Sequence, residues 1–183
     1  MYKFRLLIIW TIVLASCNSA QQKPAEGGTA ATNASENAPA DLPYKASYSS
    51  SWSTDVTDAD LKMVLMTYKN WADGNMKGLG AGMADTVEYD NANGKHYRLS
   101  NADLMKMWTT SRDSLSSIVI DMEAWQKMYS TDKKEGHIVT WYKETDTYKT
   151  GKVDSAYFQD INRLKNGKIV WYAQYKRPAL PNQ

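Results

Sequence analysis

The chain is poor in the residues that form disulfides and transition-metal sites. Its 183 residues include one cysteine, Cys17, and two histidines, His96 and His137. A single cysteine can form neither an intramolecular disulfide nor a thiolate cluster, and the two histidines are too far apart for an H-x-x-x-H or H-x-H pair. A metal site would have to be built mainly from carboxylates, so we expect no metal and no other cofactor.

An excess of basic residues is also missing. The chain has 22 lysines and arginines against 20 acids, and the first 16 residues contain two of the bases, Lys3 and Arg5, with no acid. Without that segment the basic and acidic side chains balance. Nucleic-acid binding requires a basic footprint. We therefore expect no nucleic-acid partner.

The sequence has one long apolar run, residues 6–15, preceded by Lys3 and Arg5. A helix needs about 20 residues to cross a bilayer, whereas a shorter run after positive charges is typical of a signal peptide. The run ends in Leu14-Ala15-Ser16-Cys17, which resembles the lipobox of bacterial lipoproteins. The resemblance implies cleavage after Ser16 and acylation of Cys17, and several acyl chains on one residue anchor a protein stably.

The alternative interpretation is an ordinary secretory signal followed by a free cysteine. The lone cysteine at the cleavage point favours lipidation, and Asn18 rather than aspartate at the next position favours the outer membrane. We expect a protein of the bacterial cell envelope that contacts the membrane through its lipid anchor only. Periplasmic and surface display both stay open.

Composition divides the chain into three parts. After the predicted signal peptide, residues 1–16, Ala, Ser, Thr, Asn, Gln, Gly and Pro dominate and apolar side chains are scarce. Such a segment cannot bury enough surface to offset its ordering entropy. We interpret residues 17–54 as the lipidated cysteine with a flexible tether, and residues 55–183 as one folded domain. Near the end of the tether, Tyr44, Tyr48 and Trp52 are expected to begin to dock on this domain.

Periodicity predicts an α+β domain. An Asn166-Gly167 turn between two apolar, aromatic-rich runs is typical of a β-hairpin. Apolar residues at helical spacing follow the candidate caps Thr57 or Asp58 and Ser100 or Asn101. The predicted helices are 58–72, 75–83 and 101–113, and the predicted strands are 86–90, 95–99, 116–130, 137–149, 153–164 and 168–176.

Gly78, Gly80 and Gly82 resemble a phosphate-binding loop only superficially. They follow a helix and lead into a strand, which is the reverse of the order that a nucleotide site needs. We interpret these glycines as permitting close packing.

The order ααββαββββ, with W-A-D-G-N late in the first helix and L-K-N-G-K-I between the last strands, resembles the NTF2-like superfamily and its SnoaL-like bacterial branch over residues 55–177. The resemblance implies a cone, in which a strongly bent antiparallel sheet wraps around three N-terminal-side helices. It also implies a pocket between sheet and helices, and homodimers through the outer sheet face.

Isomerase chemistry in this superfamily requires a tyrosine on the first helix and a carboxylate base on the first strand. Here Thr67 rather than Tyr68 falls at the tyrosine position. Tyr89 falls at the base position, with Asp90 one residue late, and a one-residue slip turns a strand side chain to the other face. No catalytic residue is assigned, and the candidates for an acid or base are Asp90, His96 and Asp121.

Asp121 is expected to share a strand face with Val119 and Trp125. On the last strand, Trp171 and Tyr175 are expected to share a face with Ile169. The aromatic candidates for a ligand pocket are Tyr68, Trp71, Trp108, Trp125, Trp141, Tyr157, Trp171 and Tyr175.

We expect this domain to bind an unidentified small molecule without catalysis. One alternative is an isomerase-, hydratase- or cyclase-like enzyme acting on a small apolar or carbonyl substrate. The other is a pure dimerisation or interaction module, with aromatic and methionine side chains filling the core and the interface.

Overall fold

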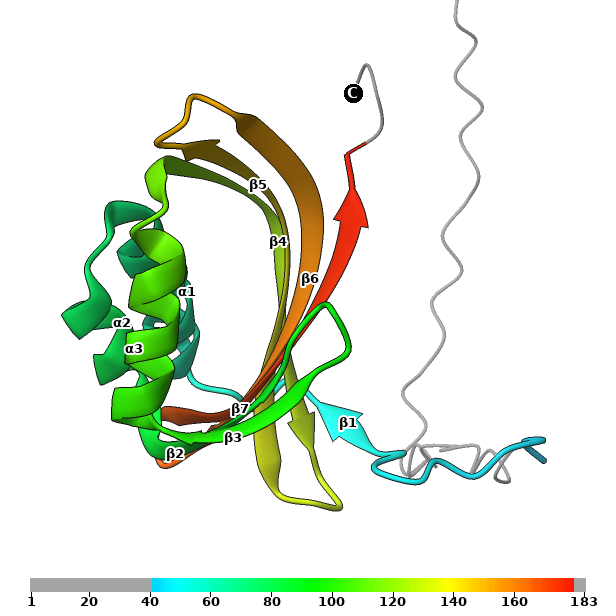
Figure 1. The fold of residues 1–183 in the computed structure, drawn as a ribbon. Helices are drawn as coiled ribbons and strands as arrows, with labels where there is room; N and C mark the ends of the chain where they lie inside the picture. Colours follow the sequence, from blue (N-terminus) through cyan, green and yellow to red (C-terminus); the bar gives the residue numbers. More distant parts are fainter. Residues whose placement is uncertain (1–40, 180–183) are drawn as a thin grey trace, which may run out of the picture. The chain divides into compact units, whose positions relative to one another are not determined.

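A strongly bent sheet of seven strands, with three helices held in its bend, forms the part of the chain that the computed structural model describes, residues 41–179 (Figure 1). The predicted signal peptide, Cys17 and most of the predicted tether lie outside the described residues. The elements are β1 Trp52–Ser53, α1 Asp58–Asp73, α2 Met76–Ala81, β2 Met83–Asp90, β3 His96–Ser100, α3 Asn101–Arg112, β4 Leu115–Ser130, β5 Glu135–Tyr148, β6 Val153–Lys165 and β7 Lys168–Pro178. The predicted order is confirmed, with β1 added before it.

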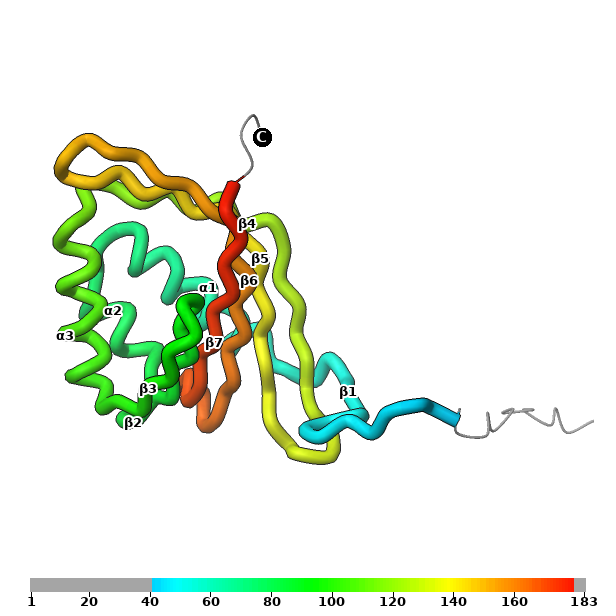
Figure 2. The backbone as a smooth tube through the Cα atoms, turned by 45° about the vertical axis from the view of Figure 1, so that its right-hand side comes forward, coloured from blue at the N-terminus to red at the C-terminus, as the bar shows by residue number. Residues whose placement is uncertain are grey.

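The strands lie in the order β1-β4-β5-β6-β7-β2-β3. All neighbouring pairs are antiparallel except β2 and β7, which run parallel. The long strands β4, β5 and β6 curve around the helices, and a second view shows the helices inside this curve (Figure 2). The sheet thus has an inner face toward the helices and an outer face away from them.

Local signals set the boundaries of the helices. The Thr57 hydroxyl accepts a hydrogen bond from the Asp60 amide at 3.0 Å and begins α1, and Gly74 ends it with a φ of 73°. Ser100 begins α3 in the same way through the Asp103 amide. Arg112, at the end of α3, donates to the Trp71 and Ala72 carbonyls, so it ties the ends of α1 and α3 together.

The hairpin of β6 and β7 forms at the predicted turn. Asn166 and Gly167 have φ values of 51° and 67°, as a tight turn of this kind requires. The buried core lies between the inner face and the helices. Its fully buried apolar members include Val64, Val87, Leu104, Ile138 and Ile169.

The end of the predicted tether is partly structured. Within it, β1 pairs with the last residues of β4, Trp52 opposite Ser130. Tyr48 and Trp52 both lie edge-on against His137, while Tyr44 is exposed. Among the described residues, no helix has the length and apolarity needed to cross a membrane.

Candidate functional site

A cavity of about 210 Å³ opens between the inner face and the helices, and we call it the cone cavity. α1, α2, α3, β2, β5, β6 and β7 all contribute side chains to it. Its lining is Thr67, Tyr68, Trp71, Leu79, Met83, Tyr89, Asn91, Met107, Trp108, Ser111, Tyr142, Glu144, Phe158, Asn162, Tyr172 and Gln174. A mostly apolar concave site with a few polar groups is the usual form of a small-molecule pocket.

The aromatic rings of the wall form two groups. Tyr89 stacks on Tyr172 with ring centres 5.3 Å apart, and Trp108 meets both rings edge-on. On the other side, Tyr142 stacks on Phe158 at 5.3 Å and is met by Tyr68. These contacts hold the rings in place, so the cavity has a rigid aromatic wall.

Behind this wall lies the fully buried carboxyl group of Asp160 on β6. The hydroxyls of Tyr68, Tyr142 and Tyr172 donate to its Oδ2 at 3.1, 2.8 and 2.7 Å. Its other oxygen, Oδ1, is buried and receives no hydrogen bond from the described residues. Burial raises the pKa of Asp160 to about 7, although the three tyrosine hydroxyls oppose this rise.

Amide side chains complete this network. Asn162 donates to the Tyr68 hydroxyl at 3.1 Å, and Gln174 donates to the Tyr172 hydroxyl at 3.0 Å. Both amides also line the cavity. The tyrosine hydroxyls are therefore held between Asp160 on one side and amide donors on the other, which fixes their orientation.

Glu144 on β5 is the one acidic or basic residue in the cavity lining. Its Oε2 accepts a hydrogen bond from Trp71 Nε1 at 3.2 Å. Burial, followed by the nearby carboxyls of Asp146 and Asp160, raises the pKa of Glu144 to about 8. At neutral pH this side chain is mainly protonated, which is unusual for an acid and typical of functional sites.

The structure places three of the aromatic candidates, Tyr68, Trp71 and Trp108, in the wall of the cone cavity. The other five lie elsewhere. Trp141, Tyr157 and Tyr175 are on the outer face, where Trp141 and Tyr175 flank Gln159 and Tyr157 lies between Lys143 and Arg177. Trp171 is on the outer face opposite Arg163, and Trp125 is half exposed on β4.

Two β-bulges explain why the expected faces are wrong for Trp125, Trp171 and Tyr175. The register of β4 shifts between Met122 and Ala124, so Trp125 lies opposite the inner-facing Thr140 rather than sharing a face with Asp121. The register of β7 shifts between Ile169 and Trp171, so Ile169 is in the core while Trp171 faces outward. A bulge adds one residue and reverses the alternation beyond it.

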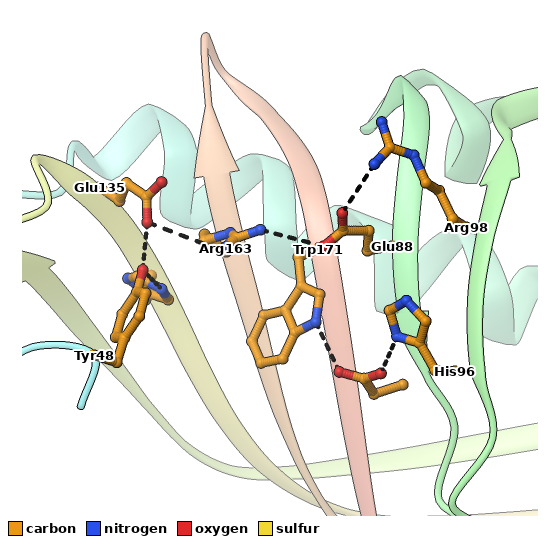
Figure 3. Close-up of polar contacts among 9 residues, drawn as sticks. Tyr48, Glu88, His96, Arg98, Glu135, Arg163 and Trp171 are labelled. Atoms are coloured by element: carbon orange, nitrogen blue, oxygen red, sulfur yellow. Dashed lines mark hydrogen bonds and ion pairs between the residues drawn. The ribbon is translucent and has the colours of Figure 1, made fainter. Parts of the chain in front are cut away.

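The acid–base candidates lie outside the cone cavity. Asp90 bonds His96 Nδ1 at 2.6 Å and accepts from Trp171 Nε1 at 2.8 Å on the outer face, where Figure 3 shows His96 and Trp171 close together. Asp121 is exposed on the outer face opposite Lys143. Tyr89, one residue before Asp90, points into the cavity instead.

A second void, the outer-face pocket, lies where the segment before α1 meets the sheet. It measures about 440 Å³ and is lined by Tyr48, Trp52, Met128, His137, Val139, Ile161, Arg163 and Trp171. Arg163 has ion pairs with Glu88 and Glu135 and lies over the Trp171 ring (Figure 3). This pocket is larger, but the carboxylates beside it already have cationic partners, so the cone cavity is the better candidate site.

Among the described residues, no group of three or more histidine, cysteine, aspartate and glutamate side chains could hold a metal ion. Glu144 and Asp160 were missed in the sequence. A signal for both was present. Glu144 shares a strand face with Ile138, Thr140 and Tyr142, and Asp160 shares one with Phe158 and Asn162, because these residues are spaced two apart. An acid in phase with buried residues on a strand is a candidate for burial.

No protein-family model and no curated protein matches the chain, but many solved structures do. An LEH-like epoxide hydrolase from M. tuberculosis has a TM-score of 0.56 at 9% identity, over 66% of this chain and 84% of that one. An NTF2-like protein from Anabaena variabilis has 0.55 at 14%, over 69% and 96%. A ketosteroid isomerase-like protein from Catenulispora acidiphila, in complex with trimethylamine, has 0.52 at 13%, over 62% and 84%. The chain therefore has the NTF2-like fold, as the sequence predicts.

Proposed function

We propose that this protein binds a small molecule in the cone cavity. The observation that carries the proposal is the combination of a preformed aromatic cavity with a few oriented polar groups at its wall, Glu144, Asn162 and Gln174. Cavities of this kind bind ligands through apolar contact and use the polar groups for orientation. The similar folds include a hydrolase and a protein holding trimethylamine, so the fold accommodates small molecules.

A second candidate function is catalysis by proton donation. Because burial raises the pKa of Glu144 to about 8, its carboxyl group carries a proton at neutral pH and faces the cavity. A protonated carboxyl can donate to the oxygen of a carbonyl or an epoxide as charge develops there. Such chemistry would be lost in Glu144→Gln, whereas binding of the substrate would remain.

We also propose that the protein is anchored to the membrane by lipid on Cys17 and that it forms homodimers through the outer face. Tyr175 is 58% exposed and Val119 53% exposed on that face. Glu88 lies between Arg98 and Arg163, and Arg163 lies between Glu88 and Glu135. A row of alternating charges is self-complementary under a two-fold axis, which suits a second copy of the same chain.

Native mass spectrometry of the full chain, purified gently from its own host, tests the binding proposal. We expect excess mass that disappears on denaturation. In Ser111→Phe the new ring enters the cavity from α3, and the excess mass should be lost.

The matched control is Thr110→Phe, one residue earlier and outside the cavity lining. Both wild-type hydroxyls donate to a carbonyl of the preceding turn of α3, Thr110 to Lys106 and Ser111 to Met107, so both variants lose the same kind of bond. Equal retention of the excess mass by the two variants would count against the cone cavity as the site. A monomeric mass for the wild type would contradict the dimer.

A further inference from the structure

The cone cavity has carboxyl groups in and behind its wall that can become negatively charged, but no basic residue lines it. Its lining includes Glu144 but no lysine, arginine or histidine. Asp160 lies directly behind the wall, and neither carboxyl takes part in an ion pair with the described residues. Buried carboxyls are normally paired with a cation or a metal.

The two carboxyls also have unused acceptor capacity. Trp71 donates the one hydrogen bond that Glu144 receives from the described residues, and that bond reaches Oε2 only. Asp160 Oδ1 receives none. Both carboxyls have a raised pKa because burial disfavours their ionised forms, and a cation in the cavity would reverse this effect.

The rest of the wall suits a cation as well. Seven of the sixteen lining residues are aromatic, and they come from both the helices and the sheet. The faces of tryptophan, tyrosine and phenylalanine attract cations, and aromatic cages with a nearby carboxylate recognise substituted ammonium groups.

We propose that the ligand of the cone cavity is a small organic cation, an ammonium group carrying alkyl substituents. This inference rests on the proposed function, since it names the class of ligand for the same cavity. The alkyl groups would contact the aromatic rings and the positive charge would lie near Glu144. A volume of about 210 Å³ equals about seven waters at about 30 Å³ each, so the ligand is small.

Two basic side chains, Lys176 and Arg112, lie near the cone cavity, and each already has partners of its own. Lys176 on β7 is at the rim, with its Nζ 5.6 Å from the centre of the Phe158 ring and 3.8 Å from Asp154. Arg112 on α3 is occupied by backbone carbonyls of Trp71, Ala72 and Leu115. Neither lines the cavity, so neither replaces a cationic ligand.

Titration calorimetry of the full chain with a matched pair of probes tests the inference. Choline and 3,3-dimethylbutan-1-ol have nearly the same shape, and only choline is charged. We expect choline to bind about tenfold more tightly or better, which corresponds to the value of cation–aromatic and charge contacts in a desolvated site. In Glu144→Gln the preference for choline should become smaller but not disappear, because the neutral amide keeps the shape and removes the charge, while the aromatic rings remain.

The control variant is Glu123→Gln, which removes an exposed carboxyl on β4 outside the cavity lining and should keep the preference for choline. If the neutral alcohol binds as tightly as choline to the wild type, the cavity binds ligands but the cationic class is wrong. If neither probe binds and the native protein carries no retained molecule, both the proposed function and this inference fail. The comparison in the wild type decides the matter even if Glu144→Gln does not fold.

Discussion

The tyrosine hydroxyls around Asp160 illustrate how one residue shapes the cavity wall. Each hydroxyl must donate to the same carboxylate oxygen, so the three rings converge on a point inside the sheet. Burial raises the pKa of Tyr68, Tyr142 and Tyr172 well above the ordinary value for tyrosine. These groups therefore stay neutral donors over the physiological pH range, and Asp160 and Glu144 are the groups there that titrate near neutrality.

The raised pKa of Glu144 predicts a pH-dependent stability. Between pH 4.5, the ordinary pKa of glutamate, and about pH 8, Glu144 of the folded protein holds a proton that the unfolded chain releases. This difference stabilises the folded protein. The contribution is fully present below pH 4.5 and is lost as the pH rises through 8, with a slope of up to about 1.4 kcal/mol per pH unit. Asp160 contributes to stability with the same sign, and its contribution is lost between pH 3.8 and about pH 7.

Urea unfolding between pH 6.5 and 8.5 measures this slope. His137, whose pKa is lowered by burial, has the opposite effect below its ordinary value of 6.5, so the chosen window avoids it. We expect the free energy of unfolding of the wild type to fall with pH and that of Glu144→Gln to fall less steeply. Glu123→Gln should follow the wild type. An unchanged slope in Glu144→Gln would show that Glu144 is ionised in the folded protein.

At the scale of elements, the sequence predicted the order of helices and strands because their signals are local. Thr57, Ser100, Asn166 and Gly167 each act within a few residues, and all four are where the structure needs them. The faces of long strands depend on unbroken alternation instead. One bulge in β4 and one in β7 reversed the assignment of Trp125 and Trp171, and no local signal in the sequence marks either bulge.

The approach of α2 to α1 depends on Gly82. A Cβ at this position would lie 2.6 Å from Thr67 Cγ2 and 3.3 Å from Met63 Sδ. The Thr67 hydroxyl donates to the Val64 carbonyl at 2.6 Å, which holds its methyl group toward the glycine. We expect Gly82→Ala to lower the free energy of unfolding by about 1–3 kcal/mol, as overpacking usually does.

The comparison for this variant is Gly136→Ala, where a Cβ would make an ordinary contact with Val56 at 3.4 Å. Urea unfolding should show a change below about 1 kcal/mol for this control. Stability of Gly82→Ala equal to that of the wild type would mean that Thr67 turns away without cost, and the packing argument would then be wrong.

For the whole molecule, the fold was predictable and the site was only partly so. The helix and strand order pointed to the cone, and Tyr68, Trp71 and Trp108 lie in its cavity wall. The burial of Glu144 and Asp160 depends on how far the sheet bends and on which strands meet, and these are properties of the tertiary structure. The interpretation of residues 17–54 as tether also missed β1, whose two residues pair with β4 and whose Trp52 packs against His137.

The proposed anchor predicts the behaviour of Cys17→Ser. In cells fed a labelled fatty acid, we expect the wild type to carry label and to sediment with membranes, because several acyl chains hold a protein there stably. The serine variant should lose the label and leave the membrane fraction. Ser19→Ala, just outside the motif, should behave as the wild type. A wild type without label would contradict lipidation and favour an ordinary secretory signal.

The parallel pairing of β2 with β7 makes β7 essential for the continuity of the sheet. β7 is the strand that joins β6 to β2 in the sheet. A polypeptide that stops before Lys168 contains every helix and six of the seven strands, yet its sheet falls into two pieces, β1-β4-β5-β6 and β2-β3. A premature stop or a frameshift before Lys168 would therefore open the sheet and leave two pairing edges exposed rather than merely shorten the protein.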